Sequence, residues 1–193
     1  MVKNIMIVGV GGQGSLLASR IVGNAAMAQG YDVKVSEVHG MSQRGGSVVT
    51  YVRYGDKVHS PVIGRGEADI IISFEQLEAA RWLSFLKKDG VLITSTQKIM
   101  PMPVITGSTQ YPDELISQIK EKNIKVVAID ALSKAEKAGS IKAVNVVLIG
   151  AMTHYSNFSK QQLLDALKTS VPQKLLSVNL NAFESGYECE QTL

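Results

Sequence analysis

Residues 5–14 read Ile-Met-Ile-Val-Gly-Val-Gly-Gly-Gln-Gly, an apolar run that passes directly into a glycine-rich turn. The run at 5–8 is typical of a parallel strand that is buried on both faces. Residues 14–28 then predict a helix, and residues 33–38 predict a second strand. A strand, a helix and a strand in this order indicate a β-α-β unit, and hence a Rossmann-like α/β fold.

The rest of the chain alternates between strands and helices until about residue 130. Strands are expected at 47–54, 68–74, 91–95 and 125–130, helices at 75–87 and 112–122, and a loop with a short strand at Val104 between them. After residue 130 only helices are expected, at 131–138, 143–156, 160–170 and 173–188. The strand at 47–54, with a hairpin partner expected at 57–60, breaks the alternation and is interpreted as an antiparallel addition. We therefore predict one domain over residues 1–193, with a Rossmann-like, mostly parallel sheet and a helical C-terminus.

Composition excludes several classes of protein. The chain has 193 residues, and 20 Lys and Arg against 17 Asp and Glu give a net charge of +3 without any basic run, so no nucleic-acid partner is expected. No apolar stretch reaches the ~18 residues of a membrane span, and the N-terminus is interpreted as a buried strand of a cytoplasmic protein. A single cysteine, Cys189, cannot supply the four or so thiolates of an iron–sulfur cluster. With 3 histidines and no H-x-x-x-H spacing, no metal site is expected either.

The glycine-rich turn fits the spacing G-x-G-x-x-G between a strand and a helix, which is the context of a nucleotide-binding loop. Glycine allows close approach of a ligand, and the helix N-terminus attracts phosphate. Glu37, near the end of the second strand, is a candidate for binding a ribose. The alternative is a turn that only permits close packing. The candidate binding residues in this loop are Gly9, Gly11, Gly12, Gln13 and Gly14.

A second polar loop follows the second strand and reads Glu-Val-His-Gly-Met-Ser-Gln-Arg-Gly-Gly over residues 37–46. Because ligands bind beyond the carboxyl ends of the strands in an open α/β sheet, both loops are expected along one edge. Arg44 is suited to a phosphate or carboxylate, or to a surface ion pair. His39 either contacts a ligand or is held by a backbone carbonyl, and Glu37 either binds a ribose or pairs with Arg44 or Arg53. Ser42 and Gln43 complete the candidate set in this loop.

The two loop motifs together, GVGGQG at 9–14 and EVHGMSQRGGSV at 37–48, resemble the gamma domain of the 2-oxoacid:ferredoxin oxidoreductases. The segment VRYGDKVHSPVIGRGEADIIISFEQLEAAR at 52–81 and NLNAFESGYE at 179–188 extend the resemblance over most of the chain. The resemblance is greatest to the small subunit of the indolepyruvate branch of that family.

The resemblance implies an activity and a set of cofactors. The family decarboxylates a 2-oxoacid oxidatively, transfers the acyl group to coenzyme A and passes electrons to ferredoxin; the indolepyruvate branch converts arylpyruvates into arylacetyl-CoA and CO2. Thiamine diphosphate and the iron–sulfur clusters belong to a larger alpha subunit. This chain would be the smaller subunit, inactive alone, which completes the active site. The resemblance links coenzyme A binding to Gly11, Gly12, Gln13, Ser42, Gln43 and Arg44.

Two other functions stay open on the residues alone. A free-standing NAD(P)-dependent Rossmann oxidoreductase would explain the glycine loop and Glu37, although the chain has no clear Tyr-x-x-x-Lys or His–acid arrangement for catalysis. A regulatory module that binds a nucleotide through the glycine loop is the other alternative. The sequence identifies no catalytic residue for any of the three functions.

Overall fold

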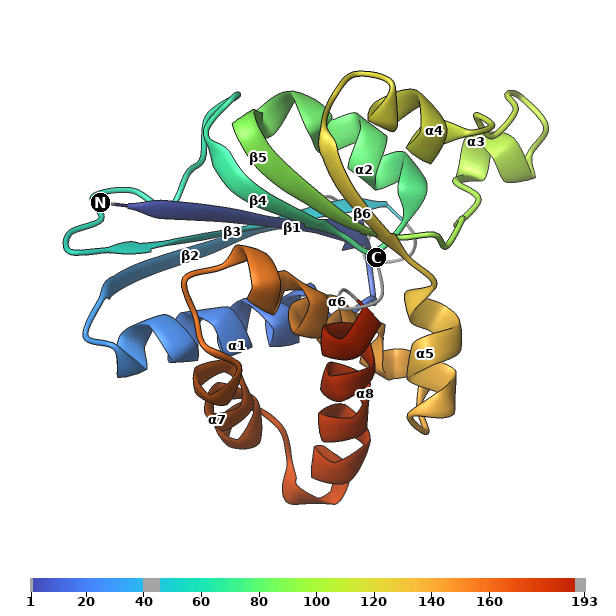
Figure 1. Ribbon diagram of the computed structural model, residues 1–193. Coiled ribbons are helices and arrows are strands. Elements are labelled where there is room, and N and C mark those ends of the chain that lie inside the picture. The colour runs from blue at the N-terminus through green and yellow to red at the C-terminus, as the bar shows by residue number, and fades with distance from the viewer. Residues whose placement is uncertain (1, 40–45, 190–193) are drawn as a thin grey trace.

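The fold is built on a six-stranded sheet with the strand order β2-β3-β1-β4-β5-β6 (Figure 1). The computed structural model describes residues 2–39 and 46–189. The strands are β1 (Lys3–Val10), β2 (Asp32–His39), β3 (Ser47–Gly55), β4 (Ala68–Ser73), β5 (Leu86–Ser95) and β6 (Lys125–Ile129). The predicted α/β class, with a mostly parallel sheet, an antiparallel pair and a helical C-terminus, is confirmed.

Strand β3 lies between β1 and β2 and is antiparallel to both, whereas β1, β4, β5 and β6 are parallel neighbours. The prediction of a hairpin partner at residues 57–60 is wrong, because β1 and β2 already occupy both edges of β3. That segment is instead a loop fixed by side chains. Asp32 Oδ2 accepts from the Val58 amide at 2.8 Å, and Arg53 donates to the carbonyls of Ser60 and Val62 at 3.1 and 2.8 Å.

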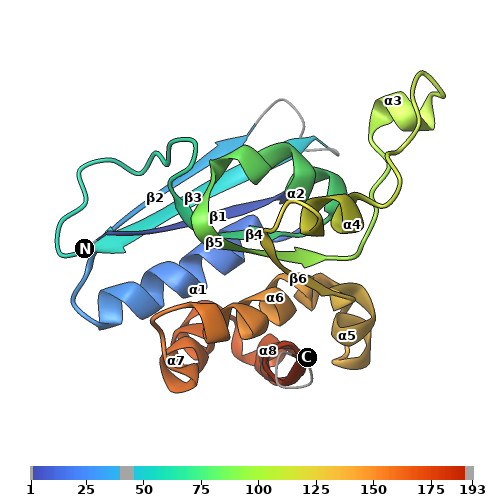
Figure 2. The ribbon, with the colours of Figure 1, turned by 45° about the horizontal axis from the view of Figure 1, so that its top comes forward.

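Helices cover both faces of the sheet (Figures 1 and 2). On one face lie α1 (Ser15–Ala28), α5 (Ala131–Lys137), α6 (Val144–Met152), α7 (Lys160–Ser170) and α8 (Leu176–Cys189), and on the other lie α2 (Gln76–Trp82) and α4 (Leu115–Lys120). The short helix α3 (Met102–Ile105) stands apart from both layers (Figure 2). The 3-10 turns η1 (Leu83–Phe85), η2 (Ile141–Ala143), η3 (Thr153–Tyr155) and η4 (Gln173–Leu175) complete the described elements.

Several predicted elements differ from the observed ones. The helix expected at 75–87 ends at Trp82, because the chain passes through η1 and then starts β5 at Leu86. The helix expected at 112–122 is the shorter α4. The strand expected at Val104 is the helix α3, whose first turn contains a proline, a residue that suits a helix start because its φ angle is already helical.

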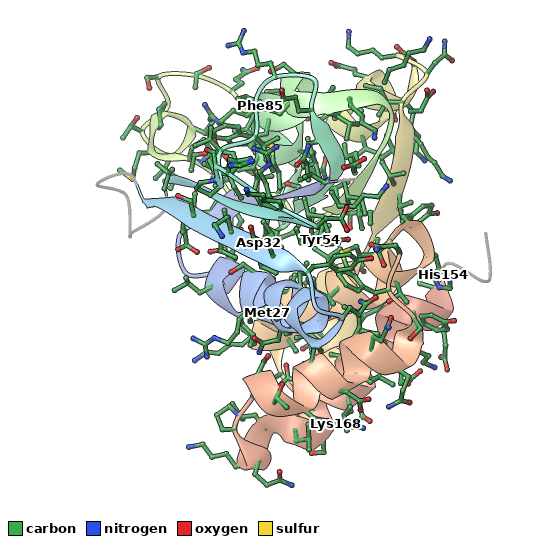
Figure 3. All side chains as sticks on the ribbon, turned by 90° about the vertical axis from the view of Figure 1, so that its left-hand side faces the viewer. Met27, Asp32, Tyr54, Phe85, His154 and Lys168 are labelled. Atoms are coloured by element: carbon green, nitrogen blue, oxygen red, sulfur yellow. The ribbon has the colours of Figure 1, made fainter. Side chains whose placement is uncertain are left out.

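The core has two parts, one on each face of the sheet. Alternate residues of β1 pack into the two parts. Ile5 and Ile7 pack toward α1 and α6, and Met6 and Val8 pack in the cluster with α2. Tyr54, which lies between the sheet and the C-terminal helices (Figure 3), donates its hydroxyl hydrogen to Asn157 Oδ1 at 2.5 Å. Strand β1 is therefore buried on both faces, as its apolar run predicts. Within the described residues, none of the helices combines the length and apolar character that a membrane-spanning helix needs.

Candidate functional site

The glycine-rich turn lies at the carboxyl ends of β1 and β4, at the position in the sheet where the chain leaves neighbouring strands toward opposite faces. After β1 it enters α1 on one face, and after β4 it enters α2 on the other. The Gly11 amide donates to the Gly46 carbonyl at 3.1 Å. This bond ties the turn to the last residue of the second loop, so both loops leave the sheet at one edge, as predicted.

The second loop itself falls mostly outside the described residues. Ser42, Gln43 and Arg44 all lie there, and His39 is described only as the last residue of β2. Their roles toward a ligand stay predictions. The two ends of that loop, at the end of β2 and the start of β3, lie next to the glycine-rich turn.

Gln13 ties the ends of β1 and β4 together. Its Oε1 accepts from the Val10 amide at 2.7 Å, and its Nε2 donates to the Phe74 carbonyl at 3.3 Å. Gly9 makes room for this arrangement, because a Cβ there would lie 2.7 Å from Gln13 Oε1 and 2.8 Å from the Phe74 ring. The amide that the sequence suggested for a ligand is thus engaged inside the protein.

Gly12 and Gly14 require glycine for conformational reasons, since their φ angles are +95° and +87°. Gly12 is exposed, and a Cβ on it would have nothing within 4 Å, whereas a Cβ on Gly14 would lie 2.5 Å from Asn145 Nδ2. Asn145, at the start of α6, is 1% exposed and donates to the Gly14 carbonyl at 3.0 Å. The turn is therefore held from α6 as well as from β4.

The N-terminus of α1 has no side-chain cap and no acidic residue in its first turn within the described chain. Its amides and the positive end of its dipole are therefore suited to an anion. Glu37 approaches from β2: its Oε2 accepts from the hydroxyls of Ser15 at 3.2 Å and Thr50 at 2.9 Å. Arg53 donates instead to Asn4 at 2.9 Å and to two loop carbonyls, so it is not the partner of Glu37.

A cavity of about 390 Å³ adjoins the turn on the side of α6. Its polar lining comes from the turn, Gln97, Asn145 and Lys142, and Lys142 makes no ion pair with any residue that the structure describes. Its apolar lining consists of Leu17, Ile99, Leu132, Ile141 and Val144. A helix end suited to an anion, beside apolar walls, fits a ligand with phosphate groups and an apolar arm.

A second cavity of about 280 Å³ lies on the other side of Ile99, against α2. It is lined by Glu75 and Glu78, which are only 1% and 4% exposed. Burial raises the pKa of the Glu75 carboxyl although its oxygens accept from the Glu78 amide and, at 3.0 Å, from the Tyr111 hydroxyl. Burial and the neighbouring carboxylate also raise the pKa of Tyr111. Glu75 thus both caps α2 and lines this edge.

Glu78 fixes the exit of the second loop. Its Oε2 accepts from the Ser47 hydroxyl and, at 3.1 Å, from the Trp82 indole, while its Oε1 accepts from Arg81 Nε at 3.0 Å. Sequence reasoning missed Glu78, Tyr111, Lys142 and Asn145 as residues of this region. Only Asn145 had a local signal, a polar residue within an apolar helix, because the other three reach the edge through contacts between distant segments.

A mostly parallel α/β sheet with a glycine turn and an uncapped helix end at its switch point defines a Rossmann-like α/β protein. The sequence profile described as Pyruvate ferredoxin/flavodoxin oxidoreductase matches residues 4–189, and the chain belongs to this family. The chain is 44% identical over 195 residues to a protein of Thermococcus kodakarensis named Indolepyruvate oxidoreductase subunit IorB, covering 98% of this chain and 96% of the relative. The predicted resemblance is therefore confirmed.

Solved structures share the fold as well. The gamma subunit of a keto/oxoacid ferredoxin oxidoreductase from Geobacter sulfurreducens has a TM-score of 0.74 and 24% identity, covering 99% of both chains. A 2-oxoglutarate:ferredoxin oxidoreductase from Magnetococcus marinus, with 2-oxoglutarate, coenzyme A and succinyl-CoA bound, has a TM-score of 0.72 and 19% identity. The match covers 100% of this chain and 31% of that longer chain. The chain is thus a small subunit of an oxidoreductase family, and partner subunits are implied.

Proposed function

We propose that this chain is the smaller subunit of a cytoplasmic, thiamine-diphosphate-dependent and ferredoxin-linked oxidoreductase that acts on indolepyruvate and related arylpyruvates. The products are an arylacetyl-CoA and CO2. The identity of 44% to a protein named Indolepyruvate oxidoreductase subunit IorB, over nearly the whole length of both chains, supports this substrate class. Thiamine diphosphate, which stabilises the carbanion formed on decarboxylation, and the iron–sulfur clusters reside on a larger alpha subunit. The small chain is inactive without it.

The part of this chain is to hold coenzyme A at the edge where β1 and β4 end. The observation that carries this proposal is the 390 Å³ cavity, in which an uncapped helix end and Lys142 lie beside apolar walls. The phosphates of coenzyme A suit the α1 amides and Lys142, and its pantetheine arm suits Leu132, Ile141 and Val144. The coenzyme A bound in the Magnetococcus marinus enzyme, which shares this fold, supports the same ligand class.

The residues that the sequence singled out have two kinds of role. Gln13 and Glu37 form hydrogen bonds inside the protein and so position the turn and the start of α1. The backbone of Gly12 and Gly14 is then available to approach a phosphate closely. Arg44, in the neighbouring loop, adds a guanidinium for a second phosphate group.

The test is steady-state kinetics of the assembled complex with Lys142→Ala and Arg44→Ala. We expect each substitution to raise the KM for coenzyme A about fivefold or more, which is about 1 kcal/mol of lost binding, and to leave the KM for indolepyruvate unchanged. Lys174→Ala, an exposed lysine on η4, is the matched control and should change neither constant. An unchanged KM for coenzyme A in both site variants would overturn the assignment of this cavity.

A further inference from the structure

Residues 99–112 form an arm that carries no charged side chain, in a chain in which 19% of the residues are charged. The arm reads Ile-Met-Pro-Met-Pro-Val-Ile-Thr-Gly-Ser-Thr-Gln-Tyr-Pro and contains α3. Three of its large apolar side chains face outward: Met100, Met102 and Ile105 are 45%, 63% and 64% exposed. Figure 2 shows α3 standing out from the body of the protein. Apolar side chains gathered at one exposed place are typical of interaction sites.

The base of the arm is fixed by polar contacts. Lys98 and Asp113 lie on either side of the arm, and Lys98 Nζ is 3.8 Å from Asp113 Oδ1. The Tyr111 hydroxyl donates to the buried Glu75 at 3.0 Å. The Gln76 amide donates to the Gln97 carbonyl at 3.1 Å. The arm therefore leaves the body of the protein at a defined position.

The tip is ordered by hydrogen bonds within the arm. The Pro103 carbonyl accepts from the Ser108 amide at 2.9 Å, from the Thr109 amide at 3.2 Å and from the Ser108 hydroxyl at 2.8 Å. The Thr106 hydroxyl donates to the Met102 carbonyl at 3.0 Å. Proline at positions 101, 103 and 112 restricts the backbone further. A segment that is ordered before binding loses little conformational entropy on contact with a partner.

The arm borders the candidate site. Ile99 lines both cavities, and Pro101, Met102 and Pro103 line the cavity against α2. If coenzyme A is held at this edge while the acyl group is formed on the larger subunit, this edge must lie against that subunit. The arm projects from the same edge, so its exposed apolar side chains meet the same neighbour.

We propose that the arm at residues 99–112 is a docking element whose apolar tip, Met102 and Ile105, inserts into an apolar recess of the larger subunit of the complex. This inference rests on the proposed function, because that function places the edge against the larger subunit. The absence of charge on the arm indicates an apolar recess, since an acidic or basic surface would be left without partners. Methionine is suited to such a contact because its flexible thioether adapts to the shape of the partner.

The test uses the full chain co-expressed with a tagged larger subunit. Met102→Gln keeps the side chain close to its original size but makes it polar, and Ile105→Thr keeps the β-branch but makes the side chain smaller and polar. Met27→Gln on α1 (Figure 3), where Met27 is 56% exposed, is the matched control. We expect the pair of arm variants to raise the dissociation constant of the complex about tenfold or more, as a hot spot does, at low and at high salt alike. The control should assemble as the wild type does.

Wild-type assembly by both arm variants would overturn the proposal. A dimer of this chain that forms in the wild type without the larger subunit and is lost in the arm variants, with assembly unaffected, would assign the arm to self-association instead. At saturating small subunit, the KM for coenzyme A should be unchanged in the arm variants. If Lys142→Ala leaves that KM unchanged while the arm variants still weaken assembly, the coenzyme A site fails and the docking element stands.

Discussion

Gly12 and Gly14 allow the two requirements on the glycine turn, backbone conformation and space, to be separated. Both have a left-handed backbone, with φ of +95° and +87°. Placing alanine in that conformation costs about 1–2 kcal/mol at either position. Gly12→Ala should cost no more than this, because nothing lies within 4 Å of its Cβ position.

Gly14→Ala has a second cost, because its Cβ would lie 2.5 Å from Asn145 Nδ2. The side chain of Asn145 must then move, which breaks its 3.0 Å hydrogen bond to the Gly14 carbonyl in a site where Asn145 is 1% exposed. Leaving a buried polar group without its partner costs about 1–3 kcal/mol. Gly14→Ala should therefore lower the free energy of unfolding by about 1–3 kcal/mol more than Gly12→Ala. For a chain of this size the gap in Tm is roughly 2–12 °C.

The assay is urea denaturation of the full chain, carried out for both alanine variants and repeated in an Asn145→Ala background. In that background the clash is removed and the hydrogen bond is already lost, so the two alanine variants should become equally destabilising. If both alanine variants lower the free energy of unfolding equally in the wild-type background, Asn145 does not add a cost at Gly14. A gap that persists unchanged after Asn145→Ala would also refute this reasoning, because the double-mutant cycle would then show no coupling between the turn and α6.

Three further predictions concern the elements around the edge and the helical layer. Because burial raises the pKa of Glu75, the folded chain binds the proton of this carboxyl more tightly than the unfolded chain does. The free energy of unfolding should therefore fall as pH rises from about 4.5 to the raised pKa. Glu75→Gln should flatten this slope in denaturation curves measured across pH. Gly186→Ala should lower the free energy of unfolding by about 3 kcal/mol or more, because its Cβ would lie 1.9 Å from a carbonyl oxygen of α6. Gly23→Ala in α1 should raise the free energy of unfolding by about 0.5–1 kcal/mol, because the nearest side-chain atoms would lie 3.8 Å from the new Cβ. Ser47→Ala removes a hydroxyl donor from the buried Glu78 and should lower the free energy of unfolding by about 1 kcal/mol. An unchanged free energy of unfolding would contradict the role of Glu78 in holding the end of the second loop.

Local patterns predicted those parts of the fold that depend on neighbouring residues. The apolar run of β1 and the helical periodicity of α1 are such patterns, and both elements form where expected. The position of β3 was not predicted, because strand order depends on pairing between distant segments. A signal was nevertheless present in the sequence: residues 48–52 are β-branched or aromatic on both faces, which is typical of a central strand, and the structure buries them all.

The same limit applies to the candidate site. The glycines of the turn could be identified from their spacing, but the residues that hold the turn could not. Asn145 bonds to Gly14 across 131 positions, and Tyr111 bonds to Glu75 across 36. Gln13 was expected to bind a ligand because it lies in the motif, yet its side-chain amide bridges β1 and β4. A motif indicates where a site lies, whereas long-range contacts decide which of its side chains face the ligand.

The two ends of the sheet differ in the exposed side chains that they carry, and this difference favours one end as the surface for a partner. At the end where β5 and β6 begin, Lys87, Lys88, Lys122 and Lys125 are exposed to solvent. At the opposite end lie the glycine turn, the two cavities and the uncharged arm. Lys87 is paired with Asp69, but removing the other three ammonium groups from water is costly unless each is paired, whereas burying Met102 and Ile105 is favourable. This difference supports the proposal that the glycine-turn end faces the larger subunit and the lysine-bearing end faces water.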